Sequence, residues 1–183
     1  MWYPAAITAA GAEPITLAQA KEQCRIEADD LDSDTHLTRL ITVARAHVEA
    51  YTGARLSTQT VAVKADCFAD MARLPVAPVQ SVSSIGYVDT NGAAQTLASS
   101  VYELRADGLE TAIVLKYDQT WPSIRSGSRI TLTAVVGYAT VPESIVHALL
   151  LLVADGFHQR ENVKADIGTA LDGLLANNRR WRF

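Results

Sequence analysis

The most constraining feature of the sequence is an apolar segment at residues 141–162, which reads VPESIVHALLLLVADGFHQREN. Pro142 suits the first position of a helix, since its missing N–H loses no bond there, and Glu143 places a negative charge beside the positive end of the helix dipole. Apolar residues recur at helical spacing and cover most of the circumference. The segment therefore predicts a central helix that is buried on several sides by its own chain, a neighbouring copy or both.

The length and composition of the chain limit the possible classes of protein. The uninterrupted apolar run at residues 148–154 is far shorter than the roughly 20 residues needed to cross a bilayer, so we expect no membrane partner. The 183 residues are 49% hydrophobic and 20% charged, which is typical of one compact globular domain. A net charge of -4 argues against phosphate binding as the main activity, but it allows nucleic acid to pass without sticking.

The N-terminal residues and the two cysteines carry no recognisable functional motif. Residues 1–12 show no hydrophobic period and no secretory signal, and we expect them to form an arm that orders only against another surface. Cys24 and Cys67 lack the spacing of a paired motif, so both are expected to be buried small apolar residues.

Two helices are predicted in the first third of the chain. The first covers residues 15–28 and starts with a capping box formed by Thr16 and Gln19. The second covers residues 34–52 and ends at Gly53. The segment between them contains Asp29, Asp30, Asp32 and Asp34. Because it lacks the glycine and the closing glutamate of an EF-hand, we interpret it as a solvated acidic loop whose last residues cap the next helix.

Residues 56–138 change to short alternating runs separated by Pro, Gly, Asn and Asp, which is typical of antiparallel strands and hairpins. Asn91-Gly92 predicts the turn of one hairpin. Further strands are predicted at residues 101–105, 113–117 and 129–136.

The resulting fold class is α+β, a small helical bundle with an antiparallel β-insertion between the second and third helices. We predict a single domain, 1–183, made of a helical part at 13–53, the β-insertion at 56–138, a second helical part at 141–176 and a C-terminal tail at 177–183.

No motif of an enzyme or a metal site is present: the sequence has no P-loop, no G-x-S-x-G, no H-E-x-x-H and no paired-cysteine spacing. We therefore expect no catalytic residues, no cofactor and no metal. Two alternatives stay open. One is a small soluble enzyme whose site is assembled from scattered Cys, His and Asp, and the other is a peptide-binding module that uses an exposed edge of the β-region.

The C-terminal tail has the composition of a docking segment, because arginines alternate with large aromatic residues. Such a mixture also suits stacking on single-stranded nucleic acid, but the chain has no second basic patch, so protein docking is favoured. The candidate docking residues are Arg179, Arg180, Trp181, Arg182 and Phe183.

Several short motifs, taken in order, resemble the head-tail connector (adaptor) proteins of long-tailed phages and the related gene transfer agents, over nearly the whole chain. They are Pro14-Ile15-Thr16-Leu17-x-x-Ala20-Lys21, the acidic loop, Val48-Glu49-Ala50-Tyr51-Thr52-Gly53, Leu74-Pro75, Trp121-Pro122, Gly137-Tyr138 and Val141-Pro142-Glu143-x-Ile145.

The resemblance implies a structural protein without catalysis. Its copies would form a homo-oligomeric ring, usually of twelve, under the portal protein, and would extend the channel through which double-stranded DNA passes without sequence-specific binding. The ring would offer an attachment surface to the stopper or another tail-side connector protein. The expected location is the neck of a virion or phage-like particle, after synthesis in the host cytoplasm. In this setting we predict that the C-terminal tail docks on the portal.

Overall fold

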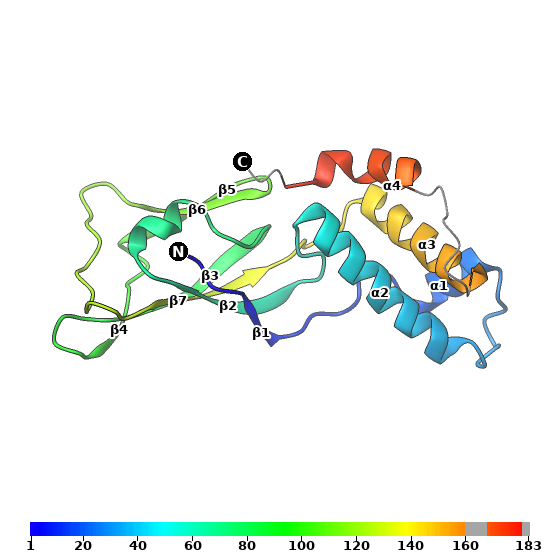
Figure 1. The fold of residues 1–183 in the computed structure, drawn as a ribbon, viewed down its shortest axis with the longest axis horizontal. Coiled ribbons are helices and arrows are strands. Elements are labelled where there is room, and N and C mark those ends of the chain that lie inside the picture. Colours follow the sequence, from blue (N-terminus) through cyan, green and yellow to red (C-terminus); the bar gives the residue numbers. More distant parts are fainter. Residues whose placement is uncertain (160–167, 181–183) are drawn as a thin grey trace. The chain divides into compact units, whose positions relative to one another are not determined.

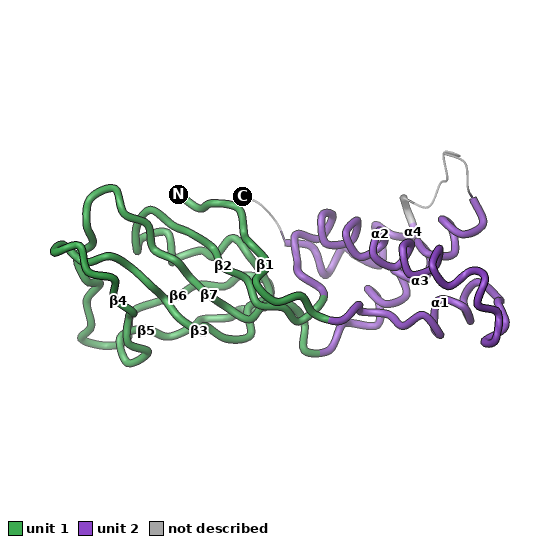
Figure 2. Tube along the Cα trace, turned by 90° about the horizontal axis from the view of Figure 1, so that it is seen from below, with its two compact units in different colours: residues 1–11, 57–139 green, residues 12–56, 140–183 purple. Residues whose placement is uncertain are grey.

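The computed structural model describes residues 1–159 and 168–180 and has the predicted α+β architecture (Figure 1). The chain folds into two compact units (Figure 2). The β unit contains residues 1–11 and 57–139, and the helical unit contains residues 12–56 and 140–183. Within the described residues, every strand lies in the β unit and every α-helix lies in the helical unit.

A five-stranded antiparallel sheet with the order β1-β2-β7-β3-β4 forms the frame of the β unit. Its central strand is β7 (Ile130–Val136), which pairs with β2 (Gln59–Ala65) on one side and with β3 (Val79–Val88) on the other. The edges are β1 (Ala6–Ala9) and β4 (Ala94–Thr96). The last strand of the sequence is therefore the one that joins the two halves of the sheet.

A second layer covers one face of this sheet. It contains the short helix η1 (Phe68–Ala72) and a hairpin made of β5 (Tyr102–Asp107) and β6 (Glu110–Leu115). Alternate side chains of β2 and β7 are buried, as expected for strands with one face in a core. The layers share one apolar cluster that includes Val63, Leu132, Met71, Tyr102 and Ile113.

In the helical unit, α3 (Glu143–His158) packs against α1 (Leu17–Cys24), α2 (Asp34–Thr52) and α4 (Gly168–Leu175), which confirms the prediction of a central helix. The short helix η2 (Ala176–Asn178) follows α4. The fully buried side chains of α3 are Ile145, Ala148, Leu149 and Val153. Most of its other apolar residues are half-buried, so the buried face of α3 is narrower than predicted.

Some predicted boundaries and environments were wrong. The first helix ends at Cys24 rather than residue 28, because Arg25 adopts a left-handed conformation with φ of 58° and ends the helix there. Residues 1–12 were predicted to form an arm that orders only against another surface; they contain β1, which pairs with β2 of the same chain. Its Trp2 donates from Nε1 to the carbonyl oxygens of Asp70 and Arg73.

The two cysteines also differ from each other. Cys24 is buried as predicted, and this burial raises the pKa of its thiol. Cys67 is exposed, because it lies at the N-cap of η1 and not on a strand facing the core.

Candidate assembly surfaces

The start of the predicted docking tail is held by the C-terminal end of α2. The backbone N–H of Arg180 donates to the carbonyl oxygen of Thr52 at 2.7 Å. The guanidinium carbon of Arg179 lies 5.0 Å from the centroid of the Tyr51 ring, a cation–π distance. The structure therefore places Arg179 and Arg180 beside the end of one long helix. Trp181, Arg182 and Phe183 lie outside the described residues.

Contacts among the helix ends fix the segment before the tail. The hydroxyl of Tyr51 donates to the carboxylate of Asp172 on α4, and this hydrogen bond raises the pKa of Tyr51. The side-chain amide of Asn178 donates to Ser144 Oγ at 3.0 Å. The base of the tail thus has defined contacts with α2 and α3.

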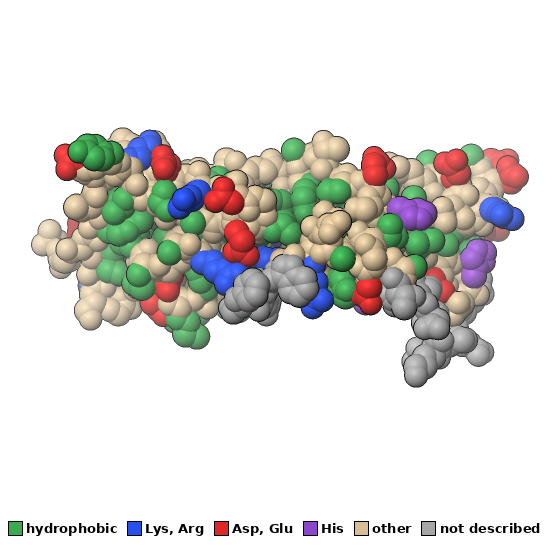
Figure 3. Space-filling model, turned by 90° about the horizontal axis from the view of Figure 1, so that it is seen from above, with side chains coloured by type: hydrophobic (Ala, Val, Ile, Leu, Met, Phe, Trp, Pro, Cys, Tyr) green, Lys and Arg blue, Asp and Glu red, His purple; other side chains and the backbone are tan. Residues whose placement is uncertain are grey.

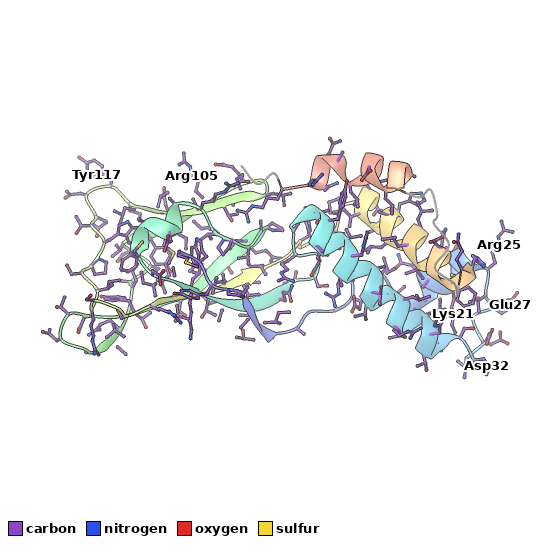
Figure 4. All side chains as sticks on the ribbon, in the orientation of Figure 1. Lys21, Arg25, Glu27, Asp32, Arg105 and Tyr117 are labelled. Carbon is purple, nitrogen blue, oxygen red and sulfur yellow. The ribbon has the colours of Figure 1, made fainter. Side chains whose placement is uncertain are left out.

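A second surface lies at the loop between α1 and α2, where Figure 3 shows acidic side chains gathered at the end of the helical unit. The loop folds around the ammonium group of Lys21; Figure 4 labels Lys21 together with Arg25, Glu27 and Asp32 of the same region. Lys21 Nζ lies 2.6 Å from Asp34 Oδ1 and donates to the carbonyl oxygens of Asp30 at 2.7 Å and Ala28 at 3.2 Å. Only 7% of the Lys21 side chain is exposed.

The observed N-terminus of α2 differs from the prediction that the last loop residues cap this helix. Ser33 occupies the N-cap of α2 but makes no side-chain capping bond. Asp34 instead uses its carboxylate on Lys21, and Asp30 Oδ1 accepts the backbone N–H of Asp32 at 2.9 Å. The ammonium of Lys21 is therefore the cation that the Asp34 carboxylate and two carbonyl oxygens of this loop contact.

Within the ranges 1–159 and 168–180, no group of three or more His, Cys, Asp or Glu side chains could hold a metal ion. In the same ranges, no helix is both long and apolar enough to span a bilayer.

A charged network supports the helical unit close to two of the three chain segments that connect it to the β unit. Glu49 is buried, and its Oε1 accepts the backbone N–H of Leu56 at 2.9 Å while its Oε2 lies 3.0 Å from Arg55 Nη1. Arg45 bridges Glu49 at 3.5 Å and Glu13 at 2.7 Å. These bonds fix the chain near residues 12 and 56, where it passes between the units.

Among the solved structures with this fold are chains from phage-like particles. A chain from the neck of an empty gene transfer agent (GTA) particle, computed with C6 symmetry, is 19% identical with a TM-score of 0.83, covering 99% of this chain and 97% of that chain. A chain from the virion of a native GTA particle is 21% identical, with the same TM-score and coverage. A chain from the neck of a native GTA particle, computed with C12 symmetry, is 20% identical with a TM-score of 0.71, covering 97% of each chain. No curated protein sequence matches the chain.

A family model defines the class of protein. The model of the phage gp6-like head-tail connector proteins matches residues 14–122, which is more than half of the chain. The chain therefore belongs to the phage gp6-like head-tail connector family, and the resemblance predicted from the sequence is confirmed. By family it is a structural connector subunit, and neither the family nor the fold supports the alternative of a small enzyme.

Proposed function

We propose that copies of this chain form a closed ring in the neck of a virion or phage-like particle, beneath the portal protein and above a stopper or other tail-side connector. The observation that carries this proposal is the match of the whole fold to chains from GTA necks computed with C6 and C12 symmetry. Double-stranded DNA would pass through the ring without sequence-specific contacts. The two units together would serve as one connector subunit.

The charge and the surfaces of the chain support this role. A ring requires two different surfaces on each copy, since each subunit meets one neighbour on either side. A net charge of -4 means that the chain has no overall excess of positive charge to hold the phosphates of passing DNA. Several weak interfaces that close together gain stability cooperatively, so assembly can depend on the portal as a template.

Mass measurement tests the ring. The purified protein is measured alone and after mixing with the portal protein of its own particle. We expect a monomer or small oligomer alone, and a multi-copy complex with a fixed ratio to the portal ring after mixing. A complex with a single copy of this chain per portal ring would contradict the proposal.

We propose further that the tail, Arg179, Arg180, Trp181, Arg182 and Phe183, is the portal-docking element. Aromatic and arginine side chains dominate interface hot spots, since they combine large apolar area with charge-assisted bonds. The contacts of Arg179 and Arg180 with the end of α2 give the segment a fixed starting point.

Two truncations separate docking from stability. The first removes residues 181–183 and leaves the bond from Arg180 N–H to Thr52 in place; the second removes residues 179–183 and loses it. We expect both to lose incorporation onto portal-bearing heads, while the first keeps the thermal midpoint of the full chain. Normal incorporation of the first truncation would reject the docking role, and a large fall of its thermal midpoint would assign these residues to the core instead.

A further inference from the structure

The net charge of the chain is concentrated in one short segment. Residues 21–34 contain two of the 16 basic residues and six of the 20 acidic residues, so this segment alone carries a charge of -4. The remaining 14 basic and 14 acidic residues balance. The end of α1 and the following loop are therefore the acidic surface of the molecule.

An apolar groove lies within this acidic surface. It has a volume of about 410 Å³ and is lined by Leu17, Ala18, Lys21, Glu22, Ile26 and Ala28. Glu22 belongs to the lining, Glu27 lies in sequence between the lining residues Ile26 and Ala28, and both glutamates are exposed. Nearby in the loop, Leu31 has 71% of its surface exposed between two aspartates. A mainly apolar groove beside exposed carboxylates is suited to an apolar side chain flanked by cations.

The basic residue in the groove does not neutralise these carboxylates. The ammonium of Lys21 is directed to Asp34 and to two loop carbonyl oxygens, so only its aliphatic stem contributes to the lining. Arg25 is the remaining basic residue of the segment, against Glu22, Glu27 and the three aspartates before Asp34. The surface thus keeps an excess of negative charge in water.

The tail of the same copy cannot reach the groove. Arg180 is bonded to Thr52 at one end of α2, whereas the groove contains Lys21, which is bonded to Asp34 at the other end. These ends are separated by 18 helical residues, or about 27 Å. The three residues after Arg180 span at most about 11 Å when fully extended. The tail of the same copy is therefore not the occupant.

We propose that this groove binds a cationic segment of a different protein of the particle, in which at least two Lys or Arg residues flank an aliphatic or aromatic anchor. Outside the tail, which the proposed function assigns to the portal, three stretches of this chain contain two basic residues and no acidic residue, at 35–48, 50–65 and 119–142. In each of them one basic residue is already engaged within its own copy: Arg45 with Glu13, Arg55 with Glu49 and Arg129 with the Tyr3 ring. A second copy is therefore a poorer source of such a segment than another protein. The inference rests on the proposed function, because it requires that the chain is built into a particle with other proteins.

Site-specific cross-linking in assembled particles tests the occupant. Ala18, an exposed residue of the groove, is replaced by photoreactive p-benzoylphenylalanine, and Ala46, an exposed alanine on α2, receives the same group as a matched control. We expect position 18, and not position 46, to cross-link to a peptide of another particle protein that contains Lys or Arg beside an apolar residue. Cross-links to a second copy, or equal yields at both positions, would overturn the proposal.

Charge reversal gives an independent measurement. Glu22→Lys with Glu27→Lys changes the rim, and Glu103→Lys with Asp107→Lys makes the same change in net charge on the β unit, where both residues are exposed. We expect the rim variant to lose about tenfold in incorporation with an unchanged thermal midpoint, and the control to lose less than twofold. Equal losses would assign the effect to net charge and overturn the proposal.

The groove and the connector role can be rejected by different results. Particles that contain the wild-type chain in their necks but give no groove cross-link would reject only the groove. Particles from which the wild-type chain is absent would reject the connector role, and the groove proposal with it.

Discussion

At the scale of single residues, Gly137 marks a very close approach between two backbone segments of the β unit. Its φ is 102°, and a Cβ atom at this position would lie 2.1 Å from the carbonyl oxygen of Ser57. Only glycine adopts this conformation without strain, and only glycine leaves room for the neighbouring chain. The glycine of the Gly137-Tyr138 motif therefore has a steric cause.

Gly137→Ala should lower the free energy of unfolding by about 3 kcal/mol or more, because both the conformation and the contact are unfavourable. The matched control is Gly127→Ala, where φ is 74° but no atom lies within 4 Å of the new Cβ. Its cost should be about 1 kcal/mol. Urea unfolding followed by tryptophan fluorescence measures both values, and equal losses would show that the contact with Ser57 is relieved by a small backbone shift.

A second residue-scale prediction concerns Lys21. Lys21→Met keeps the apolar stem but leaves the Asp34 carboxylate and two loop carbonyl oxygens without their cation, so stability should fall by about 2 kcal/mol. The control is Lys64→Met, since Lys64 is an exposed lysine on β2. Thermal unfolding compares the two variants. A Lys21→Met protein as stable as the control would contradict the structural role of the ammonium group.

At the scale of elements, the sequence predicts those parts whose signals are local. The long helix α2 was predicted with its observed bounds, Asp34–Thr52, because its apolar stripe and Gly53 lie within one segment. The hairpin at Asn91-Gly92 was predicted for the same reason. The strand β1 was missed because its pairing depends on β2, more than 50 residues away, and its four exposed residues show no alternation.

The candidate assembly surfaces also separate into features with local sequence signals and features that depend on distant partners. The composition of residues 179–183 is visible in the sequence, so a docking tail could be predicted from it. The role of Lys21 could not, because its partners meet it only after the loop turns back on α1. The end of the first helix at Arg25 was also missed, since only the folded backbone reveals the left-handed conformation of this residue.

The end of α1 gives an element-scale prediction. Arg25 ends the helix with φ of 58° and ψ of 42°, and its N–H donates to the carbonyl oxygen of Glu22. Arg25→Gly should stabilise the chain by up to about 1 kcal/mol, because glycine takes this conformation without steric strain. Arg25→Ala keeps a Cβ and serves as the control for loss of the side chain. Chemical denaturation that finds both variants equally stable would contradict the role of backbone strain here.

At the scale of the whole molecule, the chain passes between its two units three times, near residues 11, 56 and 139. Each unit therefore combines segments that are distant in sequence. Each also has its own buried residues, such as Leu132 in the β unit and Leu149 in the helical unit. Whether these units unfold together decides between the predicted single domain and two separate folding units.

The two units can be observed separately by spectroscopy. The described α-helices all lie in the helical unit, so ellipticity at the helical band reports mainly on that unit. Trp2 and Trp121 lie in the β unit, and Trp181→Phe removes the third tryptophan of the chain. In this background, we expect thermal unfolding by fluorescence and by ellipticity to give different midpoints, as in proteins whose parts unfold independently.

Gly137→Ala makes the comparison decisive. Its unfavourable contact involves Ser57, and both residues belong to the β unit, so the fluorescence midpoint should fall by several degrees while the ellipticity midpoint stays nearly unchanged. Lys21→Met is the reciprocal control, since Lys21 and its partners belong to the helical unit and should shift ellipticity alone. If either substitution moved both midpoints by the same amount, the two units would form one cooperative structure, and the chain would fold as the single domain that its sequence predicts.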